Sequence, residues 1–362
     1  STEKDLPEAD QAKFPAVHRI KDNQMKQLIM GNEAVARGAL WAGLGFFAAY
    51  PITPASEIMH FLAEKEGEIE FVHAEDEIAA IHMAIGASLA GLKAMTSTSG
   101  PGMSLKQEGI GLAQMMEVPL VVVDVQRVGP STGMPTLPSQ GDLIQARHGS
   151  HGDYNPLVFY PASVEECYLY TIEAFNAAEE SRSPVILLLD GFLAHLSETV
   201  DLRAIQPSLK KRRLAPLGKG NRHFTGLLAR EGIPLTDDSD YYREWYVRVK
   251  KKIMTVARQY NFFEFLDNPQ ADTLLIAFGI TARVIRPLKT DYGLFRPIRL
   301  FPVLEEELKK AATGYDRVVV VEMNDGQYAG EVQRVLCREI VSLPVLGGKI
   351  HLREIQEALD AL

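Results

Sequence analysis

Short apolar runs alternate with helical segments along the first half of the chain, after a small-residue amphipathic segment at residues 32–45. In chain order, the apolar runs are FFAAY, IEFVHA, KAMTSTS, PLVVVDVQ and PVILLLD. Most are apolar at consecutive positions, which is typical of strands that are covered on both faces. Because parallel strands need crossover connections, usually helices, this pattern predicts an α/β fold built on a mostly parallel sheet.

The same alternation resumes in the last third of the chain, where TLLIAFG, PIRLFP and DRVVVVEMN are separated by helical segments. The intervening stretch is charged, contains prolines and includes one long helix-like segment, YYREWYVRVKKKIMTVARQY. We therefore predict an N-terminal arm, a first α/β domain, a linker or excursion, and a second, smaller α/β domain. Their boundaries are placed at residues 1–27, 28–200, 201–268 and 269–362.

Composition narrows the class of protein. The 362 residues carry a formal net charge of −9, and the two basic runs, KKRR at 210–213 and KKK at 250–252, are interpreted as solvated faces. Nucleic acid is therefore not an expected partner. With no apolar stretch long enough to cross a bilayer and a polar, acidic start, we expect a cytoplasmic protein without a membrane partner. Two cysteines without a CxxC pair predict that this chain alone carries no iron–sulfur cluster.

The segment FFAAYPITPASEIMHFL brackets one threonine, Thr53, between Pro51 and Pro54. Proline fixes its own φ and pushes the preceding residue into an extended conformation, so the two prolines define a rigid turn between a strand and a helix. Ligands of α/β proteins bind at such junctions. Thr53 is therefore a candidate binding residue, and the alternative is a local helix cap.

A second junction, TSTSGPGMS, follows the third apolar run and opens another helix. The free backbone N–H groups around Gly100 and Gly102 can bind an anion or a polar ring, whereas the alternative is a packing turn without a ligand. The chain has no GxxxxGK[ST], and GIG at 109–111 lies inside a helical pattern, so the usual phosphate-binding motifs are not supported.

Three consecutive acids, Glu75, Asp76 and Glu77, stand where a strand meets a helix rich in alanine and glycine. At about 100° per residue they cannot all face one way, so one can enter a pocket while the others stay in water. The alternative is that they only complement the dipole of the helix. The sequence alone leaves both interpretations open.

The largely apolar run PLVVVDVQ delivers Arg127 to the end of a strand, beside a loop of Gly, Ser and Thr. A guanidinium there can bind a carboxylate through two hydrogen bonds, and the alternative is a salt bridge to Asp124 or a neighbouring acid. His148 and His151 are predicted in a loop near Asp142, without metal-ligand spacing. No metal site is predicted in this chain.

Taken together, the motifs resemble the α subunit of the 2-oxoacid:ferredoxin oxidoreductases, a family of thiamine-diphosphate enzymes. The resemblance covers about residues 28–200 and 270–335 and rests on GNEAVARGA, YPITPASE, HAEDEIAAIHMAIGAS, STSGPG, RVGPSTGMPT and VVEMNDGQ. It implies a pyrimidine-binding domain followed by a domain like the C-terminal domain of transketolase. GPSTGMPT and DGFLAHLSE are most similar to the 2-oxoglutarate members.

The resemblance also implies roles for individual residues. It makes Glu77 the catalytic acid that binds the pyrimidine ring of the cofactor, with Gly100 and Gly102 beside the cofactor. It makes Thr53 and Arg127 the groups that hold the carboxylate of a 2-oxo acid. The loop after Arg127 offers four further contacts for a second carboxylate of the substrate: Ser131 and Thr132 as hydroxyls, and Arg147 and His148 as charges. The alternative is that the partner subunit binds this carboxylate.

The family implies partners as well. Thiamine enzymes hold the diphosphate through Mg²⁺ at a GDG motif, and this chain has none. A β subunit is therefore expected to supply Mg²⁺ and a 4Fe–4S cluster, with coenzyme A as co-substrate and ferredoxin as electron acceptor. We expect an α2β2 or larger assembly, and a separate γ subunit stays open because only 30 residues precede Gly31. Three further interpretations also stay open: a pyruvate or branched-chain member of the family, a non-catalytic scaffold, and an α/β binding protein.

Overall fold

The computed structural model describes residues 26–212, 214–219, 225–231 and 233–362. The predicted N-terminal arm lies outside the described residues except for its last two positions. Parts of the predicted linker also lie outside them.

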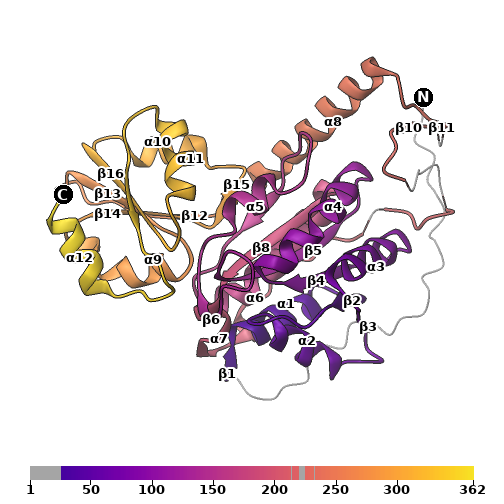
Figure 1. The fold of residues 1–362 in the computed structure, drawn as a ribbon, viewed down its shortest axis with the longest axis horizontal. Coiled ribbons are helices and arrows are strands. Elements are labelled where there is room, and N and C mark those ends of the chain that lie inside the picture. Colours follow the sequence, from indigo (N-terminus) through magenta and orange to yellow (C-terminus); the bar gives the residue numbers. More distant parts are fainter. Residues whose placement is uncertain (1–25, 213, 220–224, 232) are drawn as a thin grey trace.

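The larger part of the chain is a mostly parallel sheet with helices on both faces (Figure 1). Its strands are β2 (Phe46–Ala49), β3 (Glu70–His73), β4 (Ala94–Thr98), β5 (Leu120–Val128), β6 (Met134–Pro138), β7 (Leu157–Phe159), β8 (Pro184–Asp190) and β15 (Arg299–Phe301). Their order is β15-β7-β8-β5-β4-β2-β3, with β6 added to β5. Among these described strands only β6 and β15 pair antiparallel, so the predicted α/β class with a mostly parallel sheet is confirmed.

Helices from the first half of the chain accompany this sheet. They are α1 (Gly31–Trp41), α2 (Ser56–Ala63), α3 (Glu77–Leu89), α4 (Gly100–Met115), α5 (Leu143–His148), α6 (Val164–Ser181) and α7 (Gly191–His195). Alternate residues of β5 enter different cores: Val121, Val123 and Val125 pack on the side of α1 and α6, and Leu120 and Val122 on the side of α3 and α4. Both faces of the strand are buried, which explains the consecutive apolar residues at its start.

A second sheet forms the lobe at the left of Figure 1, with strand order β12-β14-β13-β16-β17. Its strands are β12 (Phe263–Leu266), β13 (Thr273–Ile276), β14 (Gly293–Pro297), β16 (Arg317–Glu322) and β17 (Val341–Pro344). Its helices are α9 (Gly279–Ile285), α10 (Glu305–Ala311), α11 (Gln327–Leu336) and α12 (Leu352–Asp360). All pairs of these strands are parallel except β12 with β14.

The run PIRLFP forms a strand, but not in the sheet of its neighbours in sequence. It becomes β15, which pairs antiparallel with β7 at the edge of the first sheet, with Arg299 opposite Phe159. The backbone N–H of Tyr160 also donates to the carbonyl of Ile298 at 2.8 Å. The second half of the chain therefore completes the first sheet, which joins the two parts.

The helix α8 (Ser239–Ala257) packs along α6 and projects beyond the first sheet, away from the second lobe (Figure 1). Trp245, Val249 and Ile253 are spaced four residues apart and form its buried stripe. The remaining short elements are β1 (Gln27–Met30) paired with β9 (Ser197–Val200), β10 (Ala229–Arg230) paired with β11 (Ile233–Pro234), and single 3₁₀ turns at Leu202–Ala204, Arg258–Tyr260 and Arg286–Thr290. Among the described residues, no helix has the length and apolar character needed to cross a bilayer.

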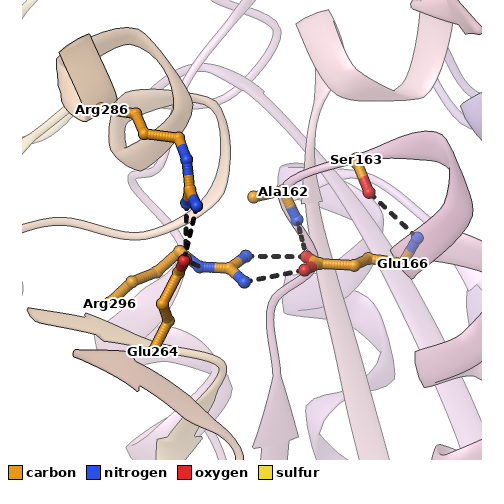
Figure 2. A network of polar contacts seen from close by, with 6 residues as sticks. All are labelled: Ala162, Ser163, Glu166, Glu264, Arg286 and Arg296. Carbon is orange, nitrogen blue, oxygen red and sulfur yellow. Dashed lines mark hydrogen bonds and ion pairs between the residues drawn. The ribbon is translucent and has the colours of Figure 1, made fainter. Parts of the chain in front are cut away.

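An ion-pair network ties the second sheet to the first (Figure 2). Arg296 on β14 donates two hydrogen bonds of 2.7 Å to the carboxylate of Glu166, in the first turn of α6. Glu264 on β12 accepts from Arg296 at 3.2 Å and from Arg286 at 2.8 Å. Bidentate pairing of this kind fixes orientation as well as distance, so it holds the two lobes at a defined angle.

Candidate active site

Several predicted site residues meet at one edge of the first sheet. Strands β2, β4 and β5 are adjacent and parallel, so the segments after their carboxyl ends lie side by side. The segments after β2 and β4 carry Thr53 and Gly100, Arg127 is the second-last residue of β5, and the neighbouring β3 leads into Glu77.

Arg127 is 8% exposed, and its Nη1 atom donates to the carbonyl oxygen of Thr53 at 2.8 Å. Its Nε atom is buried without a hydrogen-bond partner among the described residues. No carboxylate of the described chain lies within 4.0 Å of this guanidinium, so it forms no salt bridge to Asp124 or to a neighbouring acid. Its charge nevertheless acts on the buried carboxyl group of Asp142 and opposes the rise in the pKa of that group. Thr53 is exposed, and the cap of α2 is Ala55 rather than Thr53.

The three consecutive acids diverge at the start of α3. Glu75 is exposed, and Asp76 caps the helix by accepting from the Ala79 N–H at 2.7 Å. Glu77 is 6% exposed and turns towards α4. A Cβ atom at Gly102 would lie 2.5 Å from Glu77 Oε1, so the absence of a side chain there makes room for the carboxyl group.

Gly100 begins α4 and lies next to a carboxyl pair that the sequence pattern did not assign to the site. Asp124, inside β5, is fully buried beside the side chain of Asp142, which precedes α5, and both of its carboxylate oxygens lack a hydrogen-bond partner among the described residues. Burial raises the pKa of both carboxyl groups, and the charge of Asp142 raises that of Asp124 further. The available signal was an aspartate inside an otherwise apolar strand.

A cavity of about 850 Å³ opens between the two lobes at this edge. It is lined from the first lobe by Gly100, Arg127, Ser131 and Asp142, among others, and from the second lobe by Met323, Asn324, Asp325, Gln327 and Leu346–Gly348. Ser131 therefore faces the same cavity as Arg127, whereas Thr132 is exposed and does not line it. The motif VVEMNDGQ of the second half supplies the opposite wall.

Gln140 connects the two walls and was not singled out from the sequence. It is fully buried, and its Oε1 accepts from Thr281 Oγ1 at 2.9 Å and from the Met323 N–H at 3.0 Å. Its carbonyl accepts from Asn324 Nδ2 at 2.7 Å. Gly279 has a φ of +54°, and a Cβ there would lie 2.8 Å from Gln140 Nε2, so this contact requires glycine.

Arg147 and His148 lie elsewhere. They line a separate cavity of about 620 Å³, and Arg147 forms an ion pair with Glu331. His148 is the last residue of α5 rather than part of a loop. Their suggested contact with a second substrate carboxylate beside Arg127 is therefore not supported. In the described part of the chain, no group of three or more His, Cys, Asp and Glu side chains could hold a metal ion.

Family comparison places these residues in a known family of enzymes. Residues 37–261 match the family described as pyruvate flavodoxin/ferredoxin oxidoreductase, thiamine diphosphate-binding, and residues 271–353 match the pyruvate:ferredoxin oxidoreductase core domain II. The chain belongs to the 2-oxoacid:ferredoxin oxidoreductases and is of the α-subunit type. The first match contains Thr53, Glu77 and Arg127.

Curated relatives cover most of the chain. It is 41% identical to the 2-oxoglutarate synthase subunit KorA of Archaeoglobus fulgidus, over 92% of this chain and 98% of that relative. It is 36% identical to the ketoisovalerate oxidoreductase subunit VorB of Methanothermobacter thermautotrophicus, over 92% of this chain and 97% of that relative. Both relatives are named as subunits.

Solved structures agree with this assignment. A 2-oxoglutarate:ferredoxin oxidoreductase from Magnetococcus marinus, solved with 2-oxoglutarate, coenzyme A and succinyl-CoA bound, superposes with a TM-score of 0.88 at 32% identity. The match covers 93% of this chain but 65% of that one, so this chain spans about two thirds of its length. A split-gene transketolase chain shares the fold, with a TM-score of 0.55, 14% identity and coverage of 92% and 97%.

Proposed function

We propose that this chain is the α subunit of a 2-oxoglutarate:ferredoxin oxidoreductase. Such an enzyme oxidises 2-oxoglutarate with coenzyme A to succinyl-CoA and CO₂, and passes two electrons to ferredoxin. The observation that carries the proposal is the arrangement of Glu77, Arg127 and Thr53 at one sheet edge, inside the thiamine-binding family match. The substrate follows from the KorA relatives and from the 2-oxoglutarate-bound neighbour.

The residues around Glu77 fit a thiamine ring. Thiamine diphosphate supplies a nucleophilic carbon that attacks the 2-oxo group and stabilises the negative charge left by decarboxylation. Glu77 lies at a helix start beside a glycine that leaves its carboxyl group uncovered by a side chain. In this proposal it holds a proton in a hydrogen bond to the aminopyrimidine ring, with Gly100 and Gly102 beside the ring.

Arg127 and Thr53 orient the substrate. The Arg127–Thr53 hydrogen bond fixes the guanidinium, whose Nε is buried without a partner among the described residues. A 2-oxo carboxylate bound there has its scissile bond in one orientation, which is the contribution that positioning makes to catalysis. Ser131 on the same cavity, and Thr132 next to it in sequence, are proposed as contacts to the distal carboxylate.

The remaining parts of the reaction are assigned to partners. A β subunit would hold the diphosphate through Mg²⁺ and carry the 4Fe–4S cluster that passes electrons singly to ferredoxin. The assembly is proposed to be α2β2 or larger, with a separate γ subunit as an open alternative. The proposed location is the cytoplasm.

The test is to co-purify the chain with its β subunit and measure viologen reduction that depends on a 2-oxo acid and on coenzyme A. We expect the highest kcat/KM with 2-oxoglutarate, and no activity or tight thiamine diphosphate binding in the isolated chain. A preference for 2-oxoisovalerate would support the branched-chain alternative, which the VorB relative motivates. A well-assembled complex that is inactive with every 2-oxo acid would support a non-catalytic scaffold.

A further inference from the structure

A completely buried lysine, Lys106, forms a hydrogen bond with the backbone of Glu77. Lys106, in the second turn of α4, is 0% exposed. Its Nζ atom donates to the backbone carbonyl of Glu77 at 3.2 Å and to Thr96 Oγ1, on β4, at 3.0 Å. Within the described chain, no carboxylate oxygen lies within 4.0 Å of this ammonium group. The charge is thus buried with two neutral acceptors.

Burying a lysine in this way lowers the stability of the fold, which favours a further role for the residue. An ammonium group without an ion pair in the interior loses its hydration, and an apolar side chain of similar length would fill the same space without that cost. Burial lowers the pKa of Lys106 to about 8, against the opposing charges of Glu77 and then Asp76. Both acids belong to the start of α3, whereas β4 presents the uncharged Thr96.

The position of Lys106 on α4 relates it to the Glu77 carboxyl group. Gly102, Lys106 and Gly109 are four and three residues apart and therefore share one face of the helix. A Cβ at Gly102 would touch Glu77, and a Cβ at Gly109 would lie 2.6 Å from Ile81 Cγ2. This face of α4 packs against α3, and Lys106 places a positive charge on it.

We propose that Lys106 is a positioning residue for Glu77: its two hydrogen bonds hold the first turn of α3 against β4, and its positive charge keeps that turn in place. The catalytic consequence rests on the proposed function, but the placement and charge coupling do not. Above the pH at which Lys106 loses its proton, the charge-assisted bonds weaken and the Glu77 carboxyl group is held less firmly.

The coupling is tested by nuclear magnetic resonance on the full chain with isotope-labelled lysine, using K106M to assign the signal. We expect Lys106 to titrate near pH 8, well below the value of about 10.4 for an exposed lysine. E77Q removes a charge that raises this pKa and should therefore lower it further. Lys93 is the control, because it is half-buried and its pKa is also lowered by burial, but the neighbouring charges are those of Glu179 and Arg212 instead of Glu77. A Lys106 signal that titrates with the exposed lysines, or that ignores E77Q, overturns the proposal.

A kinetic test uses the α–β complex and the pH profile of kcat/KM. In the wild type we expect activity to fall as pH rises through about 8. K106M should lose about 10-fold or more at its optimum together with this alkaline limb, and K106R should restore activity and move the limb to higher pH because arginine stays charged. K251M removes an exposed lysine and should change neither. Wild-type turnover and an unchanged alkaline limb of the pH profile in K106M would contradict the proposal. Inactivity of the wild-type complex would contradict the proposed function, and the NMR titration of Lys106 would then test the proposal by itself.

Discussion

Arg127 and Thr53 are 74 positions apart in sequence, yet a hydrogen bond of 2.8 Å joins the guanidinium of one to the backbone carbonyl of the other. The bond connects the end of β5 to the turn after β2, two strands that are separated by β4 in the sheet. It uses one of the five N–H groups of the arginine, and apart from the buried Nε the other donors belong to the two terminal nitrogens. The Pro51–Pro54 turn thus fixes the Arg127 guanidinium as well as its own threonine.

R127A should reduce turnover of every 2-oxo acid. Loss of a buried, hydrogen-bonded guanidinium costs about 2–5 kcal/mol in binding, which corresponds to a fall in kcat/KM of about 30-fold to more than 10³-fold. Steady-state kinetics with 2-oxoglutarate, pyruvate and 2-oxoisovalerate measure this effect. R353A is the control, because Arg353 is exposed on α12 and pairs with Glu357. A loss confined to one substrate would show that Arg127 reads the side chain rather than the shared carboxylate.

E77Q should fold and assemble but lose about 10²- to 10⁴-fold in kcat, the range typical of an acid–base group. The matched variants E75Q and D76N should cost much less. Glu75 is exposed, and asparagine can still cap α3 in place of Asp76. Comparing kcat of the three complexes, with thermal unfolding to confirm folding, checks this prediction. Near wild-type turnover in E77Q would remove the acid–base assignment.

S131A and T132A separate two candidates for the distal carboxylate. Of the two, Ser131 alone lines the cavity that contains Arg127, so S131A should lower the kcat/KM ratio of 2-oxoglutarate to pyruvate by more than T132A does. One lost hydrogen bond to a charged group is worth about 1.5–3 kcal/mol, or about 10- to 150-fold. If neither variant changes the ratio, the distal carboxylate is bound by another group, and the partner subunit becomes the first place to look.

Acid stability should depend on the contact between α8 and the end of α4. Glu117 accepts from Arg248 at 3.0 Å and from Lys252 at 2.6 Å. Burial raises its pKa, but hydrogen bonds and charge from the two cations outweigh it and bring the pKa to about 2. An unfolded glutamate titrates near about 4.3, so this contribution to stability is complete above that pH and is lost as the pH falls towards 2.

E117Q should therefore have a lower Tm than the wild type at about pH 6, and the difference should shrink at about pH 3. Thermal unfolding at the two pH values measures it, with E68Q as an exposed control. A difference that stays constant with pH would mean that Glu117 contributes through packing rather than through its charge.

The secondary-structure elements and the local chemistry follow from the residue pattern. Consecutive apolar residues predict parallel strands that are covered on both faces. The structure confirms the α/β class. The proline turn at Thr53 and the glycine junction at Gly100 are local features, fixed by backbone geometry within a few residues. The ordered motifs located Glu77 and Arg127, and the family comparisons confirm the family to which those motifs pointed.

Which segments meet depends on the packing of the two lobes. The sequence PIRLFP is compatible with a strand in either sheet. It pairs with β7 of the first sheet because of how the two lobes pack. Arg147 lies in the same predicted loop as Ser131, yet the turn of α5 carries it to a different cavity. Gln140 and Lys106 carried no recognisable pattern, because their partners come from other strands and helices. Hydrophobic periodicity reports the environment along one element, whereas contacts between elements depend on long-range packing that no local pattern encodes.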